Sequence, residues 1–134
     1  VTFSIEHAIL TKRIVKVGGS DSRVLSLQVD GPEVLGEHHI AFFCEVPDAG
    51  RYRVSLEMIE DSRQGGLQLC ANGQPVASVQ DFHADTPAKG NPRMMGEFEL
   101  TAGVNRVYFK VSAPADASGP FALEFVTLTL ERIR

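Results

Sequence analysis

The sequence predicts an all-β protein built as an antiparallel β-sandwich of about nine or ten strands. Alternation of apolar and polar residues recurs along nearly the whole chain, whereas no segment repeats apolar residues at helical spacing over three turns. Turn signals separate the alternating segments, among them Asp30-Gly31-Pro32, Pro47-Asp48-Ala49-Gly50 and Asn72-Gly73. Many short strands with closely spaced turns are typical of a sandwich or barrel rather than of parallel βαβ units.

The expected strands follow from this alternation. The clearest is 50–60, in which every second residue from Tyr52 to Met58 is apolar. The other expected strands are 2–8, 12–17, 23–29, 38–46, 67–71, 75–81, 95–100, 104–112 and 121–132. We expect strands 95–100 and 104–112 to pair as a hairpin, and we expect 82–93 to form a long polar loop.

Length and charge narrow the classes of protein to consider. The chain has 134 residues, the length of one domain, and its net charge of −4 disfavours a nucleic-acid partner. No apolar run is long enough to cross a membrane. We expect a single domain over residues 1–134, excised from a larger multidomain protein. The start at Val1, without methionine or a signal peptide, is typical of a mature product or of an excised domain.

The two cysteines are expected to be free thiols. Cys44 falls on the apolar face of its strand, whereas Cys70 falls on the face opposite Leu67 and Leu69. Opposed faces favour one core cysteine and one strand-surface cysteine over a disulfide bridge, which stays the alternative.

Several turn-and-strand motifs occur in a recognisable order. They are Val46-Pro-Asp-Ala-Gly50-Arg-Tyr52-Arg-Val, Gly65-Gly66-Leu-Gln-Leu, Asn72-Gly73-Gln-Pro-Val, Val79-Gln-Asp81-Phe82-His83, Met95-Gly96-Glu-Phe-Glu-Leu100, Ala102-Gly103-Val-Asn105-Arg-Val-Tyr108-Phe and Phe121-Ala-Leu-Glu124-Phe-Val-Thr-Leu. Together, over residues 23–132, they resemble the galactose-binding-like jelly rolls appended to bacterial glycoside hydrolases and related secreted proteins.

This resemblance implies a jelly-roll fold and a non-catalytic accessory role. The implied function is carbohydrate binding or substrate orientation in an extracellular or periplasmic bacterial protein. The implied partners are a polysaccharide or oligosaccharide and a parent catalytic domain. The sequence departs from the family pattern at Glu124, where aspartate is usual, and at Phe82-His83, which replaces an aliphatic–tyrosine pair.

The polar loop holds the first candidate ligand-binding residues. Planar groups that form two hydrogen bonds at once suit the adjacent hydroxyls of a sugar. The candidates in and beside the loop are Asp81, His83, Asn91 and Arg93, with Asp85 and Lys89 nearby. The alternative is a solvated loop in which Asp81 caps its own turn.

Tyr108 is the second candidate ligand-binding residue. It is expected to face outward between Arg106 and Lys110, as a platform on which a sugar ring could stack. Alternatively it packs under a neighbouring loop or against a parent domain. Phe43 and Phe82 are the phenylalanines expected to be exposed, and the absence of tryptophan argues against binding to flat crystalline polysaccharide.

The resemblance also implies a structural calcium ion between the first and last strands. Glu6 and Glu124 are the candidate ligands, and calcium takes about six to eight oxygens. Glu124 is expected to share a strand face with Val126 and Leu128 and to point inward, where a lone charge is costly. An arginine or lysine partner would relieve that cost without an ion.

No catalytic motif is present. The sequence has no Gly-x-Ser-x-Gly elbow, no His-Glu-x-x-His and no phosphate loop. The alternating carboxylates Glu57, Glu97 and Glu99 are expected to be solvated. The alternative to sugar binding is a structural or oligomerisation module that associates through an outward apolar set of Phe43, Met94 and Met95.

Overall fold

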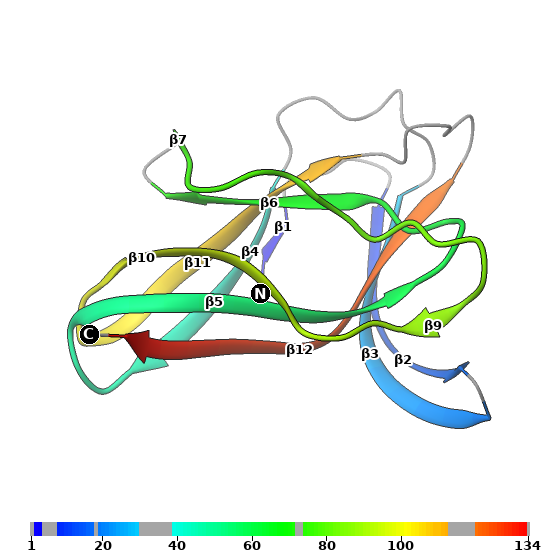
Figure 1. The fold of residues 1–134 in the computed structure, drawn as a ribbon, viewed down its shortest axis with the longest axis horizontal. Coiled ribbons are helices and arrows are strands. Elements are labelled where there is room, and N and C mark those ends of the chain that lie inside the picture. The colour runs from blue at the N-terminus through cyan, green and yellow to red at the C-terminus, as the bar shows by residue number, and fades with distance from the viewer. Residues whose placement is uncertain are drawn as a thin grey trace.

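The protein is a sandwich of two antiparallel β-sheets, as the alternation predicts (Figure 1). The computed structural model describes residues 2–3, 8–17, 19–29, 39–71, 74–112 and 120–133. These ranges consist of strands and the turns between them. No helix within them is long and apolar enough to cross a membrane.

The first sheet has the strand order β1-β4-β11-β6-β7, with β8 also paired to β6. Its strands are β1 (Thr2–Phe3), β4 (His39–Val46), β11 (Gly103–Ser112), β6 (Gly66–Ala71), β7 (Gln74–Pro75) and β8 (Gln80–Asp81). Strand β11 is central, because it pairs with β4 along one edge and with β6 along the other.

The second sheet has the order β10-β5-β12-β3-β2, with β9 also paired to β5. Its strands are β10 (Arg93–Leu100), β5 (Gly50–Glu60), β12 (Phe121–Ile133), β3 (Ser20–Val29), β2 (Ala8–Val17) and β9 (Ala88–Lys89). Strands β2 and β3 pair along their whole length and project at one end of the sandwich (Figure 1).

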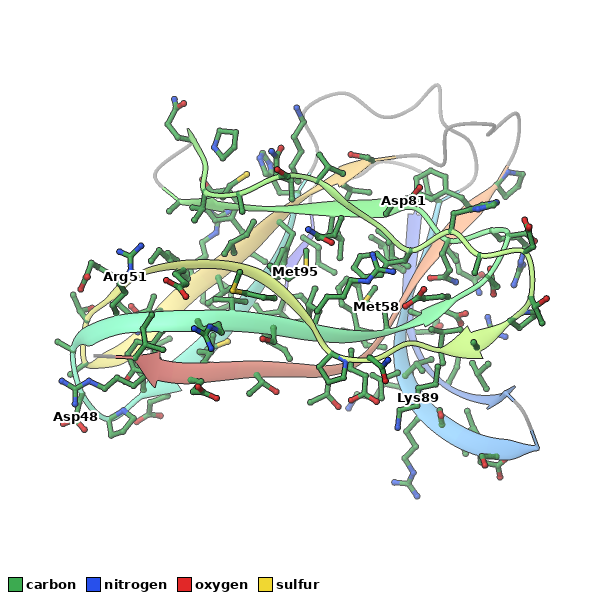
Figure 2. All side chains as sticks on the ribbon, viewed as in Figure 1. Asp48, Arg51, Met58, Asp81, Lys89 and Met95 are labelled. Carbon is green, nitrogen blue, oxygen red and sulfur yellow. The ribbon has the colours of Figure 1, made fainter. Side chains whose placement is uncertain are left out.

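The core lies between the sheets and is built from the inward-facing residues of both. Strand β5 shows the expected pattern, since its alternate residues Tyr52, Val54, Leu56 and Met58 are all buried. Figure 2 shows Met58 and Met95 in the space between the sheets.

Strand β12 departs from simple alternation because it contains a β-bulge. Its pairing with β5 shifts register between Phe125 and Thr127. An extra residue reverses which positions face inward. Leu123 and Phe125 therefore pack into the core before the bulge, whereas Leu128 packs against it after the bulge.

Two strand predictions are wrong in detail. The expected strand 75–81 is two separate two-residue strands, β7 and β8. The pairing of β6 with β7 that the Asn72-Gly73 turn signal predicts is present. Pro75 has no N–H to donate, and the chain beyond it meets β6 through isolated bonds such as Val76 N–H to Leu69 O. The expected loop 82–93 contains the short strand β9.

The expected strand 2–8 is described only in part. Residues 2–3 and residue 8 lie in strands, and residues 4–7 lie outside the described residues.

The expected hairpin of 95–100 with 104–112 is also wrong. Strands β10 and β11 follow each other in the chain but lie in different sheets, β10 beside β5 and β11 between β4 and β6. Both strands turn an apolar face to the same core from opposite sides, so the connection crosses from one sheet to the other. Gly103, at φ +102°, supplies the backbone conformation that this crossing requires.

The outward apolar set is not a single surface. Met95 is fully buried, because the register of β10 shifts between Met94 and Gly96. Phe43 and Met94 are each 54% exposed, but Phe43 lies on the outer face of the first sheet and Met94 on that of the second. The three residues therefore do not form the association surface that was expected.

A pair of phenylalanines tests this arrangement. We expect Phe109→Ala, which empties a fully buried position, to lower the free energy of unfolding by about 3–5 kcal/mol. Phe43→Ala, on the exposed face, should change it by about 0.5 kcal/mol or less. Urea unfolding followed by fluorescence measures both, and equal losses would contradict the assignment of inner and outer faces.

Candidate functional site

The structure brings Asp81, His83 and Arg93 together beside the polar loop. Asp81 ends β8, and its Oδ1 accepts the His83 backbone N–H at 3.0 Å. Its carbonyl oxygen accepts a hydrogen bond from Arg93 Nη1 at 2.6 Å. The carboxylate of Asp81 therefore caps its own turn, which is the alternative that turn chemistry offered.

Arg93 is engaged by its own protein. Its Nη2 donates to Glu60 Oε1 at 3.0 Å, and its guanidinium lies 4.8 Å from the centre of the Phe82 ring. The expectation that Phe82 is exposed is wrong, because only 1% of it is accessible. Its backbone N–H bonds to the Gly65 carbonyl, so the residue after β8 stays against β6 and its ring enters the core.

Asp81, His83 and Asn91 are exposed, whereas Arg93 is partly buried. The guanidinium of Arg93 is already bonded to the Asp81 carbonyl and to Glu60, and one carboxylate oxygen of Asp81 accepts the His83 N–H. The polar loop therefore offers a sugar fewer contacts than its sequence indicates.

Tyr108 faces outward from the first sheet but is not exposed as expected. It is 8% accessible and clusters with Ala41 and Cys70, its cross-strand neighbours on β4 and β6. The guanidinium of Arg106 lies 4.4 Å from the centre of its ring, and the edge of His39 approaches at 5.3 Å. Alternation predicted the correct face, but neighbours on that face cover the ring.

The two predicted groups of ligand-binding residues do not meet. Along β6, Asp81 pairs opposite Gly66 and Tyr108 pairs opposite Cys70. Four residues of strand separate these positions by about 13 Å. Asp81, His83, Asn91 and Arg93 thus belong to one end of the sandwich and Arg106 and Tyr108 to another.

Arg106 and Tyr108 line a groove of about 400 Å³, which we call the Tyr108 groove. Its other lining residues are Ala71, Phe98, Glu99, Leu100 and Asn105. The groove forms because the pairing of β6 with β11 stops at Tyr108, while β11 continues to Gly103. Among the described residues, the stretch 103–107 pairs only with β4.

The polar side chains of the Tyr108 groove differ in how far they are already hydrogen-bonded within the protein. The Asn105 amide bonds to the carbonyls of Thr101 and Gly103 at 2.8 and 3.1 Å, and so it braces the turn. Glu99 and Arg106 are exposed. Glu99 was missed as a site residue, because its place in the same groove as Arg106 depends on the crossing between sheets that the sequence did not indicate.

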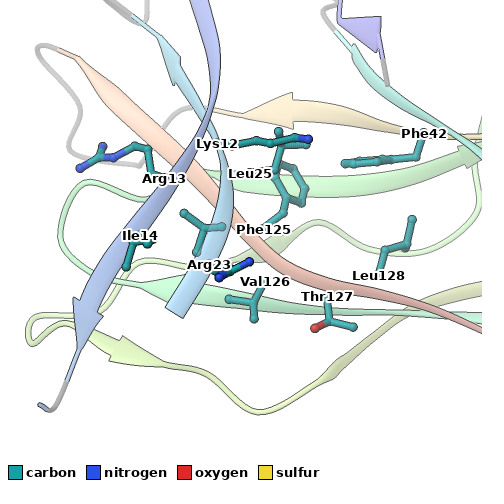
Figure 3. Close-up of a pocket in the computed structure, with 11 residues that line it drawn as sticks. Lys12, Arg13, Ile14, Arg23, Leu25, Phe42, Phe125, Val126, Thr127 and Leu128 are labelled. Carbon is teal, nitrogen blue, oxygen red and sulfur yellow. The ribbon is translucent and has the colours of Figure 1, made fainter. Parts of the chain in front are cut away.

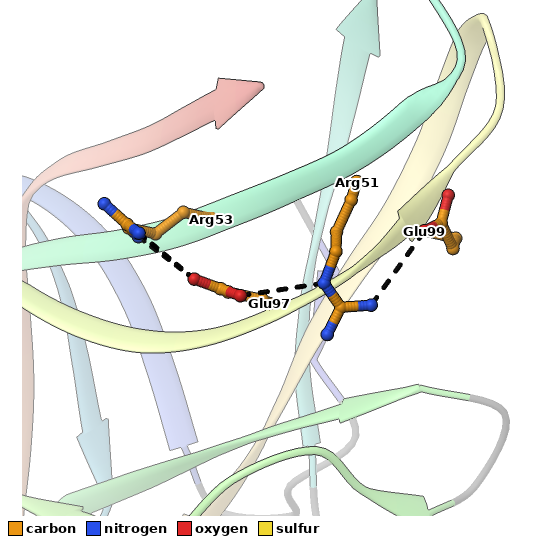
Figure 4. Close-up of polar contacts among 4 residues, drawn as sticks. All are labelled: Arg51, Arg53, Glu97 and Glu99. Carbon is orange, nitrogen blue, oxygen red and sulfur yellow. Dashed lines mark hydrogen bonds and ion pairs between the residues drawn. The ribbon is translucent and has the colours of Figure 1, made fainter. Parts of the chain in front are cut away.

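A row of ion pairs covers the outer face of β5 and β10 beside this groove (Figure 4). Arg53 donates from Nε and Nη2 to Glu97 at 3.2 Å, and Arg51 lies 3.6 Å from the same carboxylate. Arg51 also lies 3.9 Å from Glu99. These glutamates are therefore paired with cations rather than simply solvated.

Glu124 is buried, as expected, but on a different face from the one predicted. The bulge in β12 places Leu128 toward the core, while Glu124 lies on the face opposite Leu123 and Phe125 and is 2% exposed. Gln64 accepts the Glu124 backbone N–H at 3.0 Å and donates to its Oε1 at 3.2 Å. Buried amide and carboxylate thus satisfy each other.

Arg13 supplies positive charge to the remaining oxygen of Glu124. Its Nη1 lies 3.7 Å from Oε2. Neither this oxygen nor the hydroxyl of Ser26, opposite Glu124 on β3, has a hydrogen-bond partner among the described residues. Glu6, the other candidate calcium ligand, lies outside the described residues. The described residues contain no group of three or more metal-ligating side chains, and the calcium site stays a prediction.

Both cysteines are free thiols, as expected. They pair with Asn105 and Tyr108 on opposite sides of β11, about 9.6 Å apart across the sheet, beyond the reach of a disulfide. Cys70 is buried rather than at the surface, because it packs with Ala41 and Tyr108 on the outer face of the first sheet. Burial raises the pKa of the Cys44 thiol above its ordinary value.

No protein-family model matches the chain, and neither does any curated protein. Three solved structures show the same fold. A Paenibacillus xanthan lyase aligns over 96% of this chain and 12% of its own length, with a TM-score of 0.71 and 20% identity.

The other two structures contain carbohydrate-binding modules. A family 35 carbohydrate binding module from Clostridium thermocellum aligns over 93% of this chain and 92% of its own, with a TM-score of 0.53 and 17% identity. A Podospora anserina GH26-CBM35 β-(1,4)-mannanase aligns over 99% of this chain and 28% of its own length, with a TM-score of 0.55 and 16% identity. The jelly-roll fold implied by the sequence motifs is confirmed. This chain spans a small part of the lyase and of the mannanase.

The buried carboxylate gives a testable expectation. Replacing Arg13 by methionine removes the one cation that pairs with Glu124 among the described residues and should lower the free energy of unfolding by about 1–3 kcal/mol. Adding Glu124→Gln should restore most of the loss, because a buried amide costs less than an unpaired charge.

Arg23→Met is the matched control, since Arg23 is an exposed cation of the adjacent strand with no ion pair among the described residues. Chemical denaturation of the unchanged domain, the two single variants and the double variant measures the free energy of unfolding of each. If Arg13→Met costs no more than Arg23→Met, the ion pair does not stabilise Glu124.

Proposed function

We propose that this domain is a non-catalytic carbohydrate-binding accessory module of an extracellular carbohydrate-active protein, with the Tyr108 groove as its glycan site. The fold supports this, since it is shared with a family 35 carbohydrate binding module and with segments of a xanthan lyase and a mannanase. The main support for this site is the guanidinium of Arg106, which lies over the ring of Tyr108 at the side of a polar groove.

The stack favours Arg106 as the main contact. A guanidinium held over an aromatic ring loses less side-chain entropy when it binds, and its planar fork fits two adjacent hydroxyls. The carboxylate of Glu99 can accept from a sugar hydroxyl across the groove. Tyr108, 8% exposed, orients Arg106 rather than serving as an open stacking platform.

Ion pairing of the carboxylates supports binding over catalysis. Glu57 lies 3.0 Å from Lys89, and Glu97 lies between Arg51 and Arg53. These glutamates are held in ion pairs on outer strand faces, whereas glycosidase chemistry needs two carboxyl groups that face each other across a cleft. Since polysaccharide substrates lie outside the cell, an extracellular location follows from the proposal.

His83 and Asn91 offer a second, weaker candidate for glycan contact. Both side chains are exposed. His83 follows Asp81, whose partner on β6 lies about 13 Å along the strand from the partner of Tyr108. Asn91 follows β9, which pairs with β5. Substitutions in the Tyr108 groove and substitutions at His83 or Asn91 therefore test the two candidate sites independently.

The direct test is titration calorimetry against soluble mannans, xylans, galactans and xanthan fragments. We expect saturable binding to one class of glycan, weakened about tenfold by Arg106→Ala, because the charge-assisted hydrogen bonds of the guanidinium are lost. Glu99→Gln should weaken binding less, since an amide can still accept one hydrogen bond.

Asn91→Ala is the matched control and should leave the affinity unchanged. If Asn91→Ala abolishes binding and Arg106→Ala does not, the Tyr108 groove is not the site, although the function stands. If no glycan binds and light scattering shows a stable oligomer, the domain is a structural or oligomerisation module instead.

A further inference from the structure

A second and larger groove lies beside β2 (Figure 3). Strand β2 is at the opposite end of the sandwich from the β10–β11 turn (Figure 1). The groove has a volume of about 890 Å³, and we call it the Phe42 groove. Strands β2, β3 and β12 form its walls, and Phe42 of β4 closes one side. It exists because the β2–β3 pair extends beyond the edge of the first sheet.

The floor of the Phe42 groove is the open side of the core. Leu25, Phe42 and Leu128 are only partly buried, and the rings of Phe42 and Phe125 pack edge to face at 5.2 Å. Ile14 lies at the margin with 64% of its surface exposed. Apolar side chains gathered around an open groove mark a surface that another molecule covers.

The margin of the groove is positively charged. Lys12, Arg13 and Arg23 line it, and the described lining contains no acidic side chain. Arg13 is paired with Glu124, whereas Lys12 and Arg23 make no ion pair with a described residue. The occupant that complements this surface is therefore both apolar and acidic.

Backbone groups add a third feature. Among the described residues, β2 pairs only with β3, so its other edge presents N–H and C=O groups beside the groove. An unpaired edge of this length is a template for an added strand. The positive charge along it favours a partner strand that carries carboxylates.

We propose that the Phe42 groove and the free edge of β2 bind an extended acidic–apolar polypeptide segment, which adds to the second sheet as a strand. In an antiparallel arrangement, acidic residues of the segment lie opposite Lys12 and Arg13, and apolar residues lie opposite Ile14 and Val15. This is a protein-docking surface, separate from the proposed glycan site in the Tyr108 groove.

The test uses the whole domain and a blocked octapeptide in which the order valine, leucine, glutamate, glutamate occurs twice. The amide signals of Thr11, Ile14 and Phe42 should shift saturably in nuclear magnetic resonance spectra, and high salt should weaken the binding. The same peptide with lysine in place of glutamate should not bind. Equal binding of the two peptides, or no binding of either, overturns the proposal.

Variants separate this surface from non-specific charge attraction. Lys12→Glu combined with Arg23→Glu should weaken binding of the acidic peptide about tenfold. Arg63→Glu, an exposed cation outside the groove, should leave it unchanged, and Thr127→Tyr should weaken it by filling the groove without changing charge. Equal effects of Arg63→Glu and the double variant, or a dimer formed through β2 that excludes the peptide, would refute the assignment.

Discussion

The inward faces of β5, β11 and β12 bury one apolar core, in which Leu56, Phe109 and Leu123 are fully removed from solvent. Each sheet on its own would expose this face, so neither is stable without the other. The packing also decides the path of the chain between β10 and β11. Because both strands must contribute to one core from opposite sides, their connection crosses between sheets, and Gly103 adopts a backbone conformation that permits it.

Both grooves occur where strands of unequal length leave this core uncovered. The Tyr108 groove begins where the pairing of β6 with β11 stops, and the Phe42 groove where β2 and β3 extend past β4. Their chemistry differs because different strand faces border them. The first presents Glu99 and Arg106 and suits the hydroxyls of a sugar, whereas the second presents apolar side chains beneath cations and suits an acidic–apolar segment.

The partners of the buried polar groups are also set by the packing of the strands. Glu124 is tolerated at 2% exposure because Gln64 bonds to it twice and Arg13 brings a positive charge to its second oxygen. Arg93 similarly donates hydrogen bonds to Glu60 and to the Asp81 carbonyl, and its guanidinium lies over the ring of Phe82. Polar side chains that look like a binding site in the sequence can thus stabilise the fold instead. A ligand can make contact only with the polar side chains that stay exposed and are not already bonded within the protein.

The sequence alone determined the all-β sandwich, the inward face of β5 and the pairing of β6 with β7, and it favoured two free cysteines, because strand alternation and turn chemistry are local. It also placed Tyr108 on the outer face of its strand. Only the tertiary structure decided that neighbours bury Tyr108 and Phe82, that the β12 bulge turns Glu124 away from Leu128, and that Arg106 and Glu99 line the same groove. These outcomes depend on which strands become neighbours, and that is set by packing between segments far apart in the chain.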